Sequence, residues 1–118
     1  MTRKPDFPQT KPIASNSVPW TDFKDMENFH VRVRHLSKAI GPQPYKIGVA
    51  FEELPPNSQN NPAHYHLREE EHVLILSGAL TVRIGKDFHV MKAGDYVRFP
   101  AGNPHEHCLY NHTSEVCR

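Results

Sequence analysis

The sequence has little cysteine, no long hydrophobic run and no excess of charge of either sign. Only two of its 118 residues are cysteines, Cys108 and Cys117. The N-terminus lacks the apolar block of a secretory signal peptide, so we expect free thiols in a reducing, cytoplasmic compartment. The longest apolar run is too short to span a membrane. With a net charge of +1 and both signs interspersed, neither nucleic acid nor a membrane is expected as a partner.

The sequence also lacks any stretch with convincing helical periodicity. Short segments of alternating apolar and polar residues are instead separated by turn signals rich in glycine, proline and asparagine. Strands are expected at residues 29–36, 45–54, 73–76, 79–84, 88–91, 96–99 and 105–110, with a further one beginning at 115–118. The apolar run 73–76 is expected to be a buried strand, and residues 45–54 to carry Tyr45, Ile47, Val49 and Phe51 on one face. This spacing predicts an all-β sandwich or barrel.

The length and the distribution of proline suggest one domain preceded by an arm. A chain of 118 residues is long enough for one core but not for two. Residues 1–28 contain four prolines among polar residues, a composition that favours an extended arm because proline removes amide donors and disfavours helix. Trp20 and Phe23 are expected to anchor the end of this arm. Residues 29–118 are expected to form the barrel domain.

Histidine is the residue type in excess, and its arrangement is the main functional signal. Four of the nine histidines form two H-x-H pairs, His64 with His66 and His105 with His107. In an extended segment, side chains two residues apart lie on the same face, so His64 and His66 can converge on one point. Glu71 follows them at the start of the next apolar run. Imidazoles and a carboxylate on neighbouring strands are ligands that a divalent transition metal prefers.

The second H-x-H pair supplies the histidine that His64, His66 and Glu71 lack. Both His105 and His107 are expected to face inward on one strand, so alternation alone does not choose between them. His105 directly follows Pro104, where the turn is only becoming a strand, whereas His107 lies one pleat deeper. We therefore predict His107 as the ligand and His105 as a group near the mouth. His30, His35, His89 and His112 stand alone and are interpreted as surface or satisfied histidines.

The two half-sites together resemble the cupin superfamily. His64-x-His66, four residues, Glu71, six residues and Gly78 are similar to its first motif. Gly94, five residues, Pro100-x-Gly102, then His107, three residues and Asn111 are similar to the second, although the germin-like spacing would select His105. The pattern is similar to that of small bacterial single-domain cupins of unassigned activity. The resemblance implies a double-stranded β-helix, or jelly-roll barrel, with the metal inside its mouth and usually a homodimer.

Two functional hypotheses follow from a site with His64, His66, Glu71 and His107. Such a ligand set leaves two octahedral positions open for water or an oxygen ligand. An enzyme of the dioxygenase or isomerase type would use the metal, which the residues allow to be iron, manganese, nickel or zinc, to polarise a small substrate. Alternatively, the same cavity would hold a sugar or an organic acid in a non-catalytic binding or sensing module, because a fold does not fix a function.

Overall fold

The computed structural model describes residues 11–25, 28–41, 43–60 and 69–118. An N-terminal antiparallel sheet has the order β1-β2-β3 and consists of β1 (Thr21–Asp25), β2 (Phe29–His35) and β3 (Ala50–Glu53). The described helical segments of this half are short. A 3-10 turn, η1 (Ser15–Ser17), precedes β1, and an α-helical turn, α1 (Leu36–Ala39), lies between β2 and β3. Within the described residues, no helix is long and apolar enough to cross a membrane.

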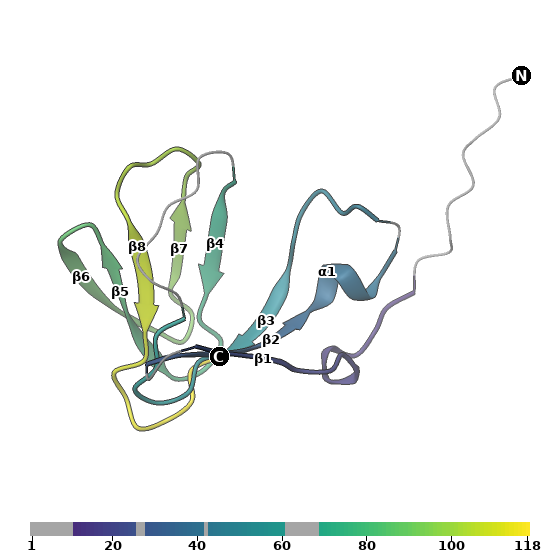
Figure 1. The fold of residues 1–118 in the computed structure, drawn as a ribbon, viewed down its shortest axis with the longest axis horizontal. Coiled ribbons are helices and arrows are strands. Elements are labelled where there is room, and N and C mark those ends of the chain that lie inside the picture. Colours follow the sequence, from purple (N-terminus) through teal and green to yellow (C-terminus); the bar gives the residue numbers. More distant parts are fainter. Residues whose placement is uncertain (1–10, 26–27, 42, 61–68) are drawn as a thin grey trace, which may run out of the picture.

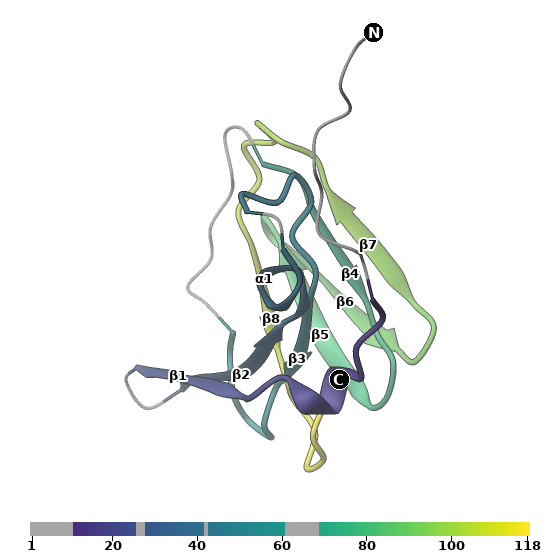
Figure 2. The same ribbon diagram turned by 90° about the vertical axis from the view of Figure 1, so that its right-hand side faces the viewer.

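The C-terminal half forms two further antiparallel sheets (Figure 1). One pairs β4 (Glu71–Leu74) with β7 (Tyr96–Phe99). The other has the order β6-β5-β8, from β5 (Ala79–Ile84), β6 (Asp87–Lys92) and β8 (His107–Tyr110). Gln59 makes isolated bridges to Phe29 and to Tyr110, and so links the N-terminal sheet to β8. The N-terminal sheet and the β6-β5-β8 sheet therefore form one layer, and the β4–β7 pair packs against it (Figure 2).

The hydrophobic core lies where the sheets meet. Strands from both halves of the chain contribute to it, together with the loop residues Leu54, Ile75 and Cys117; the buried members are Val31, Leu54, Ile75, Leu80, Val82, Met91, Phe99, Leu109 and Cys117. Leu80 and Val82 alternate with partly exposed residues along β5, as expected for a strand with one face on a core. This part of the sequence pattern therefore predicts the strand and its inner face.

The end of the chain is held by Asn111 rather than by a full strand. Instead of a strand at 115–118, Cys117 makes one isolated bridge with Leu54, and the Arg118 carbonyl accepts hydrogen bonds from the amides of Leu76 and Ser77. The fully buried Asn111 amide donates to the carbonyls of Leu54 (2.9 Å) and Glu115 (2.7 Å). These bonds join the end of β8 to the segment after β3.

Two strand predictions were wrong in detail. Of residues 45–54 only Ala50–Glu53 form a strand, and Ile47 and Val49 are exposed, so the apolar alternation there does not mark a core face. The run at 73–76 is not a continuously buried strand, because Leu74 and Leu76 are each 55 % exposed. β4 starts two residues earlier and has one covered and one open face, the pattern of a half-buried antiparallel strand.

Trp20 connects the segment before β1 to the N-terminal sheet. Its ring lies 6.0 Å from that of Phe51 and beneath the guanidinium groups of Arg32 and Arg34, 4.7 and 4.1 Å from its centroid. Phe23, the other anchor expected from the sequence, is 56 % exposed. Trp20 alone therefore supplies the anchoring contacts, by aromatic and cation–π packing.

Candidate metal centre

Glu71 and His107 meet inside the barrel. Glu71 is the first residue of β4, and His107 is the first residue of β8. The His107 Nε2 and Glu71 Oε2 atoms are 2.7 Å apart, although 36 residues separate them in sequence. The His107 side chain is only 4 % exposed, whereas that of Glu71 is 32 % exposed. A buried imidazole therefore faces a carboxylate that water can still reach.

Phe99 fixes the plane of the His107 ring. It is the cross-strand partner of Glu71 in the β4–β7 ladder, and its ring stacks on the imidazole with 3.7 Å between centroids and 2° between planes. The next residue back, Arg98, points the other way and pairs with Glu70 on the outer face. Of these two residues, only Phe99 therefore contacts the Glu71–His107 pair.

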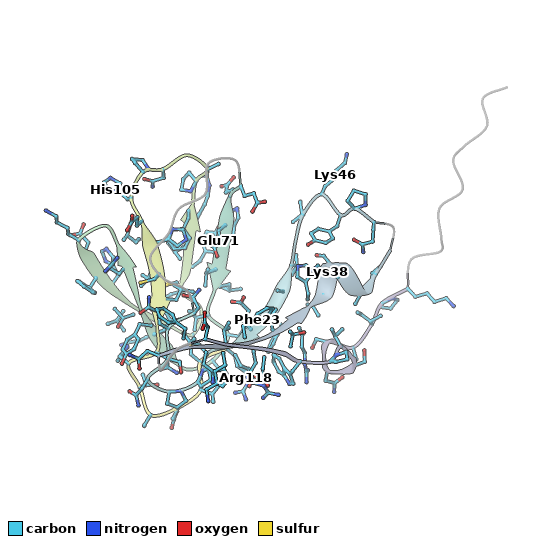
Figure 3. All side chains as sticks on the ribbon, in the orientation of Figure 1. Phe23, Lys38, Lys46, Glu71, His105 and Arg118 are labelled. Carbon is cyan, nitrogen blue, oxygen red and sulfur yellow. The ribbon has the colours of Figure 1, made fainter. Side chains whose placement is uncertain are left out.

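His105 lies apart from this pair, so the expectation that both second-pair histidines face inward was wrong. β8 begins at His107, and strand alternation does not extend back to His105. Its exposed side chain packs over the turn at Gly85, where an added Cβ would come within 3.3 Å of its Nδ1 atom. Figure 3 shows His105 on the outer loop and Glu71 among the strands.

The turn before β8 explains this separation. The Asn103 amide donates to the Pro100 carbonyl, and the His105 amide donates to Asn103 Oδ1 at 3.0 Å. Gly102 within this turn has a φ of +76°, a conformation that glycine adopts without steric cost. The turn thus holds His105 at the surface and lets the chain enter the barrel only at His107.

His64 and His66, the other two predicted ligands, lie outside the described residues. The segment that leads to them runs along β8: the Asn60 amide donates to the Leu109 carbonyl (3.1 Å), and the Leu109 amide donates to Asn60 Oδ1 (3.0 Å). Leu109 is two residues from His107 on the same face of the strand. In the described part of the chain, no group of three or more potential metal-ligating side chains occurs.

The Glu71–His107 pair has a donor set that fits a divalent metal. Two ligands bound about 2.1 Å from one ion at about 90° have donor atoms about 3.0 Å apart. The observed separation of 2.7 Å between Nε2 and Oε2 is close to this distance between neighbouring ligands. One imidazole nitrogen and one carboxylate oxygen suit iron, manganese, nickel and zinc alike.

The histidines interpreted as structural have local contacts of their own. His30 contacts Asp22 (3.3 Å), His112 contacts Thr81 (2.8 Å), and the His35 ring accepts a hydrogen bond from the Lys38 amide at the start of α1. Each lies on a different strand or loop from the Glu71–His107 pair. His89, the fourth of these histidines, is exposed on β6.

Glu52 is a site residue that the sequence reasoning missed. It lines a cavity of about 120 Å³ that lies beside the Glu71–His107 pair, since Val73 and Leu109, the next inward residues of β4 and β8, also line it. Desolvation, and then the negative charge of Glu71, raise the pKa of the Glu52 carboxyl. The side chain is exposed to solvent, as expected at the open side of a cavity. The alternation at 45–54 places Glu52 on the face opposite the apolar residues, but the sequence analysis expected the apolar face to point inward.

The fold and the site together define a cupin. A cupin domain model matches residues 50–118, so the chain belongs to the cupin family, and the predicted all-β double-stranded β-helix barrel is confirmed. The match begins at β3 and includes Glu71, His107 and Asn111.

Solved structures and a curated relative agree with this assignment. A cupin-superfamily sugar phosphate isomerase from Silicibacter pomeroyi aligns with a TM-score of 0.80 at 24 % identity, over 91 % of this chain and 71 % of that one. A predicted oxalate decarboxylase from Thermotoga maritima aligns with a TM-score of 0.75 at 22 % identity, over 91 % and 92 % of the two chains. At these identities the likeness shows the fold alone. The quercetin 2,3-dioxygenase of Bacillus subtilis is 31 % identical over 55 residues, which are 47 % of this chain but only 16 % of that enzyme.

Proposed function

We propose that this protein binds a divalent transition metal through His64, His66, Glu71 and His107 and holds a small oxygen ligand there. The observation that carries the proposal is the 2.7 Å contact between His107 Nε2 and Glu71 Oε2 inside the barrel. The Cupin family membership supports it. The H-x-H pair follows closely in sequence after Asn60, a residue that is hydrogen-bonded to Leu109 of β8.

A metal bound there would act as a Lewis acid that polarises an oxygen ligand. The residues of this chain would position and protect it. Phe99 holds the plane of the His107 ring, and burial keeps water from the imidazole. The water-accessible side of Glu71 is where a ligand would approach.

We favour a metal-dependent enzyme of the dioxygenase or isomerase type over a non-catalytic binding module. The partial identity to a quercetin 2,3-dioxygenase supports this choice. The presence of Glu52, a further carboxylate beside the site, also favours it, because proton transfer needs a titratable group near the substrate. Turnover of a small oxygen-rich substrate by metal-loaded protein would distinguish an enzyme from a binding module.

Metal content after dialysis tests the proposed ligand set. We expect His107→Ala to lose nearly all bound metal, because it removes the buried donor that faces Glu71. His105→Ala is the matched control, since that side chain lies at the surface over Gly85, and it should keep the wild-type content. Elemental analysis of untagged protein gives the readout. Loss of metal from His105→Ala with retention in His107→Ala would contradict the assignment.

We also propose that the protein forms a homodimer through β6. Among the described residues, β6 has β5 as its one strand neighbour, and Phe88 and Val90 on it are 68 % and 57 % exposed. An open edge with large apolar side chains favours pairing with a second strand. A second copy of this chain can supply that strand about a twofold axis.

Sedimentation tests the dimer. The wild-type protein should sediment as a dimer at micromolar concentration, and Phe88→Lys should raise the dissociation constant at least about tenfold, because a charge then replaces apolar contact area. Lys86→Ala, in the adjacent turn, is the control and should leave the dimer intact. A wild-type monomer at micromolar concentration would refute this assembly.

A further inference from the structure

Glu52 points into the barrel because its neighbours on β3 occupy the opposite face. Phe51 packs on Trp20, and Glu53 binds Arg32 and Arg118, each at 3.3 Å. Side chains alternate along a strand, so Glu52, between these two residues, lies on the other face. There it lines the cavity beside the Glu71–His107 pair.

The cavity wall is apolar apart from a few groups. The apolar part comes from both halves of the chain and includes Val31, Leu54, Val73, Ile75, Leu80 and Leu109. Arg118 also contributes, but its guanidinium Nε atom is paired with Glu53. His72 contributes too, while its ring nitrogens contact Tyr96 and Glu70 on the outer face. Among the described residues, no cation is paired with Glu52.

Glu52 and Glu71 lie close enough for their charges to interact, although both side chains remain accessible to water. The negative charge of Glu71 is one of the two causes that raise the pKa of Glu52, after desolvation. Two like charges repel each other even where water partly screens them, and a third negative charge brought by a ligand would add to that repulsion. A hydroxyl group, in contrast, can donate a hydrogen bond to the Glu52 carboxyl in either protonation state.

The net charge of the proposed centre also disfavours anionic ligands when Glu52 is ionised. Three neutral imidazoles, one carboxylate and a divalent ion would carry about +1, which would attract anions. An ionised Glu52 brings the total to about zero and removes that attraction. The apolar walls offer contact to carbon–hydrogen faces, and the carboxyl offers an acceptor to hydroxyls.

We propose that Glu52 selects neutral, polyhydroxylated ligands of the sugar type at this site and rejects small dicarboxylates. This inference rests on the proposed metal-binding function and decides between the sugar and organic acid classes that the sequence left open. Glu52 is in this view a specificity-determining residue, and it contacts hydroxyl groups of the ligand while the metal is held by other residues.

Ligand affinities of metal-loaded protein at pH 7.5 test this inference, with malonate as the anionic probe and D-xylose as the neutral one. Glu52→Gln has nearly the same shape without the charge, and we expect it to bind malonate about three- to tenfold more tightly than the wild type, the range for removing one nearby unit charge that solvent partly screens. D-xylose should bind several-fold more weakly to this variant. Glu52→Asp keeps the charge and should still reject malonate.

The control is Asp87→Asn, which removes the same charge from the exposed start of β6 and should leave the malonate affinity unchanged. Metal content is measured for every variant. An unchanged malonate affinity in Glu52→Gln at full metal occupancy would overturn this inference and leave the metal-binding proposal standing. A wild-type protein that binds no metal would overturn both.

Discussion

Chelation is expected to lower the melting temperature of the protein by about 15 °C. A ligand that binds only the native state stabilises it by about 4 kcal/mol when its concentration is a thousand times its dissociation constant. For a domain of this size, about 1 kcal/mol corresponds to several degrees. Thermal unfolding with and without excess EDTA, followed by circular dichroism, measures the shift. Restoring the metal should restore the melting temperature.

A pair of glutamine variants ties this shift to the Glu71–His107 pair. Glu71→Gln should melt at the same temperature with and without the chelator, because the carboxylate that faces His107 is gone. Glu70→Gln removes the same charge one residue earlier, where the side chain pairs with Arg98 on the outer face, and it should keep the full shift. A wild-type melting curve that does not respond to the chelator would argue against a bound metal.

The second large effect is expected at Asn111. Its side chain makes four hydrogen bonds, two donated to the carbonyls of Leu54 and Glu115 and two accepted from the amide and hydroxyl of Thr113. Asn111→Ala leaves these buried groups without their partner, which we expect to lower the free energy of unfolding by about 3 kcal/mol. Urea denaturation gives this value directly.

Two further variants separate the causes of this loss. Asn111→Asp keeps the acceptor for Thr113 but loses both donors and buries a charge, so it should be no more stable than Asn111→Ala. Ser114→Ala changes an exposed position in the same turn and should stay within about 0.5 kcal/mol of the wild type. A free-energy change below about 1 kcal/mol in Asn111→Ala would show that the amide is not what holds the C-terminal segment.

The strands of the C-terminal half could be predicted because their signals are local. In β5 the alternation around Leu80 and Val82 matches the observed inner face, and the turn at Gly85 fixes the hairpin with β6. The prediction failed at residues 45–54 and 73–76, where apolar residues are exposed to solvent. Alternation divides a strand into two faces, but it contains no information about which face other strands will cover.

The sequence by itself determined the fold class and brought Glu71 and His107 into one candidate site, since the strand periods and the motif spacing are written along the chain. Only the tertiary structure decided that His107 lies inside and His105 outside, because β8 begins where Ile84 pairs with His107. It also decided that Glu52 faces the cavity. Both outcomes depend on contacts between segments far apart in sequence, and the pattern within one segment does not encode them.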